Sequence, residues 1–298
     1  MTTLIQLLAS GMALGAVYSL IALGFVVIYR ASQVFNFAQG ELLSVGAFTM
    51  VAFVELGLPW GIALFCAMVT TGILAAVIER GIMRPMIGRP VFVSAILTIF
   101  IGFFLRAMII IVWGVEPMGM PTPWETTGVV TLGGARILWN SIGALAFGGA
   151  MLLSFFLVIR YTKLGVAMRA TSSDQETSLA HGIPVGRILG LTWFMSGVFA
   201  AVGGIFLGMF PNNVDGNLGL IALRAFPAVI LGGLESVAGA IAAGFILGIL
   251  EVLAQAYLNP ALGSFGHNFH AVFPYVVMVL VLVVRPHGLF GRPEVERV

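Results

Sequence analysis

The chain has 298 residues, of which 60% are hydrophobic and only 9% are charged, and its formal net charge is +2. A mean hydropathy of +1.09 predicts a polytopic membrane protein, because apolar stretches of about 20 residues cross a bilayer as helices. A basic surface that binds nucleic acid needs a soluble domain to present it, and the composition leaves room for none, so nucleic acid is excluded as a partner.

Apolar runs separated by charged or Pro/Gly clusters predict an all-α transmembrane bundle of about eight spans. The runs are 4–29, 40–56, 59–79, 91–113, 138–159, 186–210, 237–257 and 270–284. A shorter run at 221–234 is interrupted by Pro227, Gly232 and Gly233. We therefore expect a discontinuous or re-entrant helix near 221–236.

The Lys and Arg residues predict the orientation, because basic residues in short loops are retained on the cytoplasmic side. Placing the 80–90 and 160–187 loops inside leaves Arg136 and Arg224 outside and Arg106 within a span. The inside set is Arg30, Arg80, Arg84, Arg89, Arg160, Lys163, Arg169, Arg187, Arg285, Arg292 and Arg297. This bias predicts a cytoplasmic C-terminus, and counting 221–234 as a crossing places the N-terminus outside.

Glycine pairs spaced four residues apart predict close helix contacts. The pairs are Gly11 and Gly15, Gly204 and Gly208, and Gly244 and Gly248. Such pairs support either a tightly packed bundle or a dimer, and the sequence does not choose between them.

Ionisable residues inside predicted spans are a further signal, since charge at membrane depth is costly unless it faces a cavity, a partner or the interface. Glu55 and Glu79 lie at span ends, where we expect them to reach interfacial water. For Arg106, a structural ion pair with a glutamate on another helix and a role in transport both fit the sequence. The residues within spans are Arg106, Glu41, Glu235 and Glu251.

The segment FNFAQGE at 35–41 predicts a helix start, because Asn36 can cap a helix and Gln39 stands where a capping box closes. Amide protons at a helix start within a bundle can receive a substrate carboxylate, although a cap at the membrane surface needs no such function. QGELLSVGA at 39–47 is echoed faintly by GGLESVAGA at 232–240. Repeated broken segments mark the substrate route in transporters, and chance is the alternative explanation.

The sequence contains no recognisable catalytic set. GxxxxGK[ST], GxSxG and HExxH motifs do not occur, which leaves no phosphate loop, nucleophile elbow or zinc helix. His181, His267, His270 and His287 lack the clustered cysteines or carboxylates of a metal site. We expect no catalytic residue, no metal and no cofactor on this chain, and transport in place of an enzymatic activity.

The polar block from Arg160 to Arg187 lies between two long apolar runs. Its first part favours helix, and Gly182 and Pro184 are typical of a helix end before the next span begins. We therefore expect it to present a short helix to a cytoplasmic protein.

Five blocks, in family order, resemble the membrane subunit of the branched-chain amino acid type of ATP-binding-cassette importer. Within the third block, Glu176 and Gly182 have the glutamate-to-glycine spacing of the importer coupling motif, with Thr177 and Ser178 in place of the usual alanines. The blocks are GMALGAVYSLIALGFVVIY at 11–29, FNFAQGELLSVGAF at 35–48, GVAMRATSSDQETSLAHGIPVGRI at 165–188, AVILGGLESVAGAIAAGFILGILE at 228–251 and RPHGLFG at 285–291.

The resemblance implies a single permease domain, 1–298, in a prokaryotic inner membrane, with 160–187 as its cytoplasmic coupling loop. The implied cargo is branched-chain amino acids or related small polar or carboxylate substrates. The implied partners are two ATPase subunits that bind ATP and Mg, a second permease subunit that is a related chain, and a periplasmic or lipid-anchored binding protein.

Carried over residue by residue, the resemblance also assigns two sets of site residues. The family usually has histidine where Gln39 stands and glycine where Glu235 stands. The residues expected to meet the ATPase are Arg169, Asp174, Glu176 and Gly182, and those in the translocation region are Asn36, Gln39, Glu41 and Glu235.

A stand-alone ion-coupled secondary transporter or channel is the alternative from another class. The intramembrane glutamates, Arg106 and the broken segments favour it, and it requires no ATPase partner.

Overall fold

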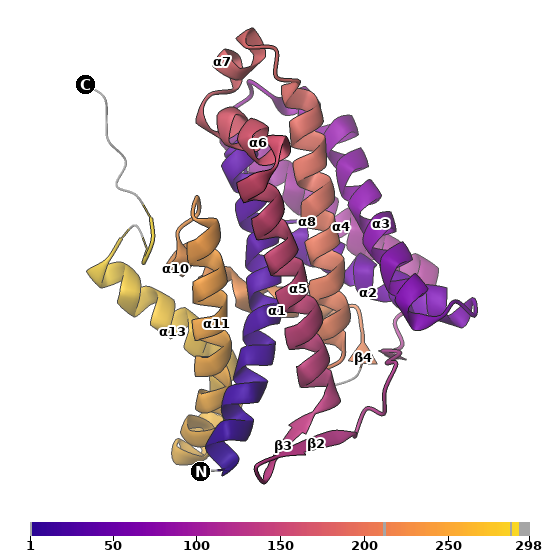
Figure 1. The fold of residues 1–298 in the computed structure, drawn as a ribbon, viewed down its shortest axis with the longest axis vertical. Coiled ribbons are helices and arrows are strands. Elements are labelled where there is room, and N and C mark those ends of the chain that lie inside the picture. The colour runs from indigo at the N-terminus through magenta and orange to yellow at the C-terminus, as the bar shows by residue number, and fades with distance from the viewer. Residues whose placement is uncertain (1, 211–212, 287, 292–298) are drawn as a thin grey trace.

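The computed structural model describes residues 2–210, 213–286 and 288–291, which form a bundle of long helices (Figure 1). His287, Arg292, Arg297 and the C-terminus, for which the sequence makes predictions, lie outside the described residues. The long helices are α1 (Thr2–Ser32), α2 (Gln39–Glu55), α3 (Trp60–Ile78), α4 (Val91–Trp113), α5 (Trp139–Tyr161), α8 (Val185–Gly208), α11 (Val237–Leu253) and α13 (Phe269–Val284). Each of the eight long runs predicted from the sequence therefore coincides with a helix.

Short helices fill the connections. Six apolar helices of the described chain are long enough to cross a membrane, while α2 and α13 have 17 and 16 residues and span about 25 Å each. The prediction of a polytopic helical bundle is confirmed, and of the eight predicted spans six meet the length of a membrane crossing in the described residues. The short helices are α6 (Lys163–Ser173), α7 (Gln175–Ala180), α9 (Leu218–Ile221), α10 (Phe226–Gly232) and α12 (Asn259–Ala261), with 3-10 turns at Arg84–Met86, Ala222–Ala225 and Gly263–Gly266 and π-helical turns at Glu79–Met83 and Ala254–Leu258.

Prolines mark where several helices begin. Pro59, Pro90 and Pro184 each stand directly before α3, α4 and α8. Proline tolerates this place because the first turn has no intrahelical partner for its N–H. Gly114 ends α4 with a φ of +86°, a backbone conformation that glycine adopts without steric cost. The chain therefore carries its own start and stop signals for these spans.

α1 is the central helix, and most of it from Gly11 onward is buried against α11, α8 and α5. Where α1 meets α11, a Cβ added to Gly248 would lie only 2.3 Å from the nitrogen of Gly15. Ser19 on α1 also donates a hydrogen bond of 2.8 Å to the carbonyl of Ile241 on α11. The two backbones therefore touch, as small residues permit. Two of the predicted glycine pairs act inside the bundle.

The expected break near 221–236 is confirmed. Leu218–Ile221 is α-helical, Ala222–Ala225 is a 3-10 turn, and α10 ends at Gly233, whose φ is +92°. α2 is itself continuous but also begins inside the bundle: after α1 ends at Ser32, residues 33–38 turn back, and the side chain of Gln39, the first residue of α2, donates to the carbonyl of Ser196 on α8. Both helices therefore begin within the bundle.

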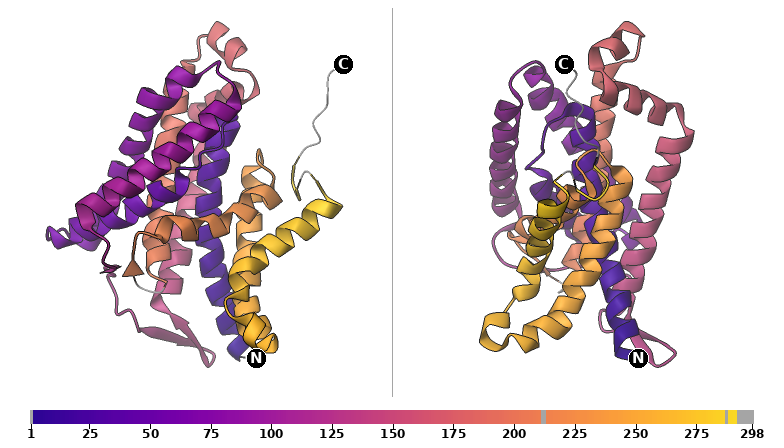
Figure 2. Two further views of the ribbon diagram at one scale, coloured as in Figure 1. Left: turned by 180° about the vertical axis from the view of Figure 1, so that it is seen from behind. Right: turned by 90° about the vertical axis from the view of Figure 1, so that its left-hand side faces the viewer.

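Two small strand pairs were not predicted. β1 (Met118–Gly119) pairs with β4 (Asn213–Val214), and β2 (Val129–Leu132) pairs with β3 (Ala135–Leu138) in a hairpin. Figures 1 and 2 show the β2–β3 hairpin beside the start of α1, while α6 and α7 project at the opposite end of the bundle. The polar block and the hairpin are thus separated by the length of the helices.

Candidate functional site

The polar block forms two short helices joined at one residue, and we call residues 162–184 the coupling segment. Thr162 caps α6 by accepting a hydrogen bond from the Gly165 amide, 3.4 Å away. Asp174 ends α6 and caps α7, accepting hydrogen bonds from the amide of Thr177 at 3.0 Å and from its hydroxyl at 2.6 Å. These two bonds favour the charged carboxylate and lower the pKa of Asp174 below its usual 3.8.

α7 ends at the predicted glycine. Gly182, at φ +79°, donates to the carbonyl of Leu179, and Ile183 donates to the carbonyl of Ser178. This pair of bonds is a Schellman motif, which satisfies carbonyls at a helix end that would otherwise lack partners. The prediction that glycine and proline stop this helix before the next span is confirmed.

Three hydrogen bonds tie the coupling segment and the start of α8 to the rest of the bundle. The guanidinium of Arg169 donates to the carbonyl of Ile159 at 2.5 Å, near the end of α5. The side chain of Gln175 donates to the carbonyl of Ala31 at 3.0 Å, near the end of α1. Arg84 donates to the carbonyl of Gly186, in the first turn of α8. The segment itself is thereby bonded to α5 and α1, and the helix that follows it, α8, is bonded to the turn that continues α3.

The outer surface of the segment remains open. Glu176 is exposed, and Leu179, one turn later, is 59% exposed. A carboxylate beside an exposed leucine is suited to a protein partner that offers both a cation and an apolar pocket. Arg169 is also exposed, but its guanidinium differs from the other three predicted contact residues in donating to a carbonyl of the preceding helix, α5.

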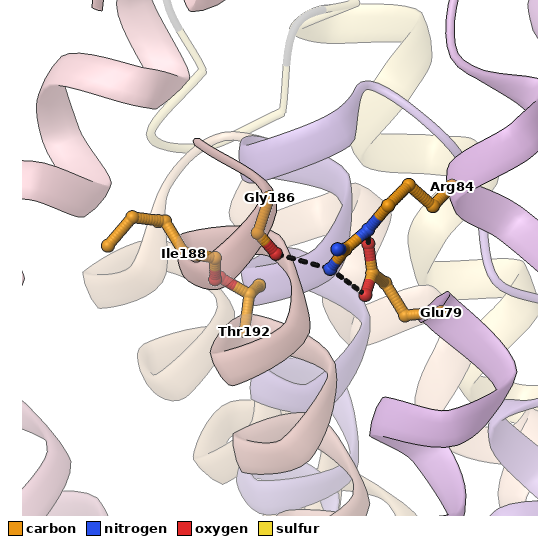
Figure 3. Close-up of polar contacts among 5 residues, drawn as sticks. All are labelled: Glu79, Arg84, Gly186, Ile188 and Thr192. Carbon is orange, nitrogen blue, oxygen red and sulfur yellow. Dashed lines mark hydrogen bonds and ion pairs between the residues drawn. The ribbon is translucent and has the colours of Figure 1, made fainter. Parts of the chain in front are cut away.

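The bond to Gly186 belongs to a cluster that we call the clamp, formed by Glu79, Arg84 and Gly186 (Figure 3). Arg84 donates from Nε to Oε1 of Glu79 at 3.0 Å and from Nη2 to Oε2 at 2.7 Å. Glu79 is only 2% exposed, so the expectation that it reaches interfacial water was wrong. A two-pronged pair of this kind can hold a carboxylate away from water.

The clamp also explains why the 59–79 run was predicted to end too early. The helical path continues through Glu79–Met83 and Arg84–Met86, so the expected 80–90 loop shortens to four residues, 87–90. The charged residues here indicated a loop, but Arg84 folds back onto Glu79 and the two charges pair within the helical path. A cavity of about 190 Å³ beside the clamp is lined by Gln175, Trp193 and Arg84, among other residues.

The start of α2 forms a second polar cluster. Asn36 accepts a hydrogen bond from the Ala38 amide at 3.1 Å and donates to Oε1 of Gln39 at 3.3 Å, and Ser196 on α8 donates to the same oxygen at 2.9 Å. Asn36 and Gln39 are 1% and 0% exposed. The helix start is confirmed, but the predicted cap was wrong, because the N-cap is Ala38, which makes no side-chain cap bond, and Asn36 accepts from the Ala38 amide. The predicted capping box was also wrong, because the Gln39 side chain bonds to Asn36 and to Ser196 on α8.

Glu41 faces away from this cluster and pairs with Arg106, a partner that the sequence could not name. Nη1 of Arg106 lies 4.0 Å from Oε1 of Glu41, and Nη2 donates to Oδ1 of Asn217 at 2.9 Å. A Cβ added to Gly219 would lie 2.8 Å from Oε1 of Glu41. The carboxylate therefore lies directly on the backbone of α9, where the broken helix begins.

Glu235 is not part of either cluster. It is exposed in the turn between α10 and α11 and accepts a hydrogen bond of 3.3 Å from Gln33. Glu251 accepts a hydrogen bond of 2.7 Å from Tyr18 and lies 3.7 Å from Arg224. The structure thus brings Asn36 and Gln39 together, places Glu41 beside them facing α4 and α9, and sets Glu235 apart.

Sequence reasoning missed Ser196, Asn217 and Thr98. Thr98 on α4 accepts from the Phe37 amide at 3.1 Å and donates to the Phe35 carbonyl at 3.2 Å. Ser and Thr are common in membrane helices. Ser196 and Thr98 are distinctive only because they bond to residues 35–39, where the chain enters α2. Asn217, next to the interrupted run, was the one that its position could have indicated.

Comparison with known proteins agrees with this architecture. A family model described as branched-chain amino acid transport system / permease component matches residues 7–282. The high-affinity branched-chain amino acid transport system permease protein LivH of Salmonella typhimurium is 30% identical, with 99% of this chain and 97% of that protein covered. The corresponding protein BraD of Pseudomonas aeruginosa is 28% identical over 99% of this chain and 98% of its own length.

Similarity extends to an archaeal relative and to a solved structure. The probable branched-chain amino acid transport permease protein LivH of Methanocaldococcus jannaschii is 27% identical, with 91% of this chain and 88% of that protein covered. PsaBC from Streptococcus pneumoniae, solved in complex with Fab, aligns with a TM-score of 0.51 at 15% identity, covering 95% of this chain and 91% of that chain. The last comparison concerns the fold alone.

Proposed function

This chain belongs to the family of branched-chain amino acid transport permeases, and we propose that its coupling segment transmits the movement of partner ATPases to a substrate route at the starts of α2 and α9, which we call the broken helices. It is a multi-pass membrane permease subunit of an ATP-binding-cassette importer for branched-chain amino acids or related small substrates. Members of this family are permease components, so the chain's role is passage of substrate and not catalysis.

The observation that carries the proposal is the construction of the coupling segment. Two short helices meet at the shared cap Asp174 and expose Glu176 and Leu179. The same segment is bonded to α5 and α1, and the clamp holds the helix that follows it. A surface that is open to a partner and fixed to three transmembrane helices is suited to passing on a displacement.

The proposal places the route at the clusters of Asn36, Gln39 and Glu41, where α2 and α9 begin inside the bundle. Helices that start at membrane depth offer polar groups to a substrate without exposing them to lipid. Both Glu41 and Glu251 lie near arginines, so an ion pair accounts for these intramembrane charges without a coupling ion.

The remaining elements of the assembly follow from the same proposal. Two ATPase subunits bind ATP and Mg on the side of α7, a second and related permease subunit completes the route, and a periplasmic or lipid-anchored protein delivers the cargo. The α7 end and the C-terminus are then cytoplasmic, residues 1–298 act as one permease domain, and ATP hydrolysis belongs to the partners alone.

Charge reversal at Glu176 tests the coupling segment. In proteoliposomes that contain the complete transporter, we expect Glu176→Lys to lower uptake by about tenfold or more while the protein still inserts. Charges at an interface face charges of the opposite sign, so a lysine here would face a positive charge on the partner. Glu116→Lys is the matched control, since Glu116 is exposed on the connection after α4, far from α7.

Substitution at Arg169 distinguishes a residue that binds the ATPase from one that holds the coupling segment in position. Arg169→Ala removes the bond to Ile159, so we expect less uptake per ATP hydrolysed with ATPases still bound. Normal uptake by both variants, with ATPases present at the normal ratio, would reject the coupling segment as the contact. Uptake by the purified chain alone under an ion gradient would favour the ion-coupled alternative.

A further inference from the structure

Three buried glutamates of the bundle lie near arginines, but their carboxylates are satisfied to different degrees. Glu79 receives two hydrogen bonds from Arg84, and Glu251 receives one from Tyr18 at 2.7 Å. Glu41 is 9% exposed, and its Oε2 has no hydrogen-bond partner in the described part of the chain. A buried carboxylate with unused acceptor capacity is costly unless a donor arrives to occupy it.

The arginine opposite has N–H donors that no residue in the described ranges is shown to accept. Arg106 gives one hydrogen bond to Asn217 at 2.9 Å, and its Nη1 lies 4.0 Å from Oε1 of Glu41. A hydrogen bond between nitrogen and oxygen requires about 2.7–3.2 Å, so this pair attracts without bonding. A guanidinium carries five N–H donors in a planar fork that matches a carboxylate. The Arg106 side chain is 27% exposed, so these donors are accessible.

Exposed apolar residues stand close in sequence to the groups that carry and contact this carboxylate. Phe37, four residues before Glu41, is 40% exposed, and Leu220, which directly follows Gly219 on α9, is 50% exposed. The ring of Phe37 packs against Phe35, which in turn contacts Phe226 at the start of α10. Apolar side chains therefore occur at the starts of both α2 and α9.

We propose that Glu41 and Arg106 together form a binding site for a zwitterionic α-amino acid. The substrate ammonium donates to the carboxylate of Glu41, the substrate carboxylate accepts from N–H groups of Arg106, and the aliphatic side chain packs toward Phe37. An α-amino acid carries both charges on one carbon, so it contacts both side chains at once from one side of the pair while Arg106 keeps its bond to Asn217. Acids without an ammonium, and amides without a carboxylate, satisfy only half of the site.

This inference rests on the proposed function, because it assumes that the broken helices line the route. It narrows the substrate from small polar or carboxylate compounds to zwitterions. A residue of the second permease subunit could instead fill the gap, and the experiment below treats that arrangement as a contrary result.

The test measures equilibrium binding of radiolabelled leucine to the complete transporter in nanodiscs without the binding protein. Competitors are leucinamide, which lacks the carboxylate, and 4-methylpentanoate, which lacks the ammonium. We expect each competitor to bind about tenfold or more weaker than leucine, since each loses hydrogen bonds to a charged group. Glu41→Gln should abolish the preference for leucine over 4-methylpentanoate, and Arg106→Gln should abolish its preference over leucinamide.

Two further variants keep the result interpretable. Gly219→Ala retains both charges but places a methyl group 2.8 Å from Oε1 of Glu41, so it should displace the carboxylate and weaken leucine about tenfold. Glu251→Gln is the matched control, because it removes a buried carboxylate on α11 and should leave the preference ratios unchanged. Ratios of competitors do not depend on how much of each variant folds.

Three outcomes would overturn the inference: equal binding of leucine and 4-methylpentanoate by the wild-type transporter, unchanged ratios in both charge variants, or no leucine binding at roughly 10 mM, where even a millimolar site is mostly filled. If the Glu41→Gln variant lost the second permease subunit while its competitor ratios stayed unchanged, the partner of the Glu41 carboxylate would be a residue of that subunit and not the substrate. Failure of ATPases to co-purify with the wild-type chain would instead reject the proposed function.

Discussion

Two glutamate–arginine pairs in this bundle contain the same side chains and are built in opposite ways. In the clamp, Arg84 bonds to both oxygens of Glu79 and to the carbonyl of Gly186. At the broken helices, Arg106 and Glu41 stay 4.0 Å apart, and one carboxylate oxygen has no hydrogen-bond partner among the residues that the structure describes. The comparison shows that a buried ion pair with both carboxylate oxygens hydrogen-bonded can fix two helices. A pair whose carboxylate lacks a hydrogen-bond partner keeps its groups available for a substrate.

The largest effect is expected from breaking the clamp. Arg84→Ala leaves the Glu79 carboxylate, 2% exposed, without its two hydrogen bonds, and we expect a loss of about 3–5 kcal/mol in the free energy of unfolding. Thermal unfolding of the detergent-solubilised protein measures it. Arg80→Ala, an exposed arginine on the same helical stretch, should change stability by no more than about 0.5 kcal/mol. Equal effects of the two substitutions would contradict the clamp.

A smaller effect is expected from crowding the clamp while keeping its charges. A Cβ on Gly186 would lie 3.2 Å from Nη1 of Arg84, and one on Gly190 would lie 3.3 Å from Oε2 of Glu79. We expect Gly186→Ala and Gly190→Ala each to cost about 1 kcal/mol, as overpacking does. Gly61→Ala, where a Cβ meets nothing within 4 Å, is the control. A neutral result at Gly186 and Gly190 would mean that the clamp is loose.

The open pair should tolerate loss of charge better than the clamp. Glu41→Gln removes a carboxylate whose Oε2 has no hydrogen-bond partner in the described chain, and it leaves Arg106 bonded to Asn217, so stability should change by less than about 1 kcal/mol. The same unfolding measurement applies. A loss as large as that of Arg84→Ala would show that Glu41 is structural, and the contrast between the two pairs would fail.

The smallest effect concerns acid and the cap shared by α6 and α7. Bonds from Thr177 lower the pKa of Asp174 below 3.8, so its contribution is present above that pH and is lost only as pH falls through the lower, folded-state value. Hydrogen exchange of α7, corrected for intrinsic rates, should therefore be unchanged between about pH 7 and about pH 5. Asp174→Ala should speed exchange at both values. A wild-type loss of protection within this range would contradict the cap.

The sequence predicts long helices well because their signals are local. Pro59, Pro90 and Pro184 stand directly before helices, and apolar runs of span length have few alternatives in a membrane protein. The break near Pro227 was visible for the same reason. Such features depend on residues that are neighbours in the chain.

What the sequence could not supply depends on pairing across the bundle. Glu79 was expected at the interface because it ends an apolar run, yet Arg84, five residues later, folds back and keeps it buried. Arg106 gave no hint of its partner, since Glu41 and Asn217 lie 65 residues before it and 111 residues after it in the numbering. Ser196 looked like any membrane serine until its hydroxyl was found on Gln39.

The β1–β4 ribbon affects how the bundle can move. It pairs the connection after α4 with the connection after α8, at the far ends of those helices from the coupling segment (Figure 2). Hydrogen bonds between these two short strands link the two connections to each other. Under the proposed function, a displacement applied at the start of α8 therefore meets a held point at its other end, and the helix turns about that point as a lever.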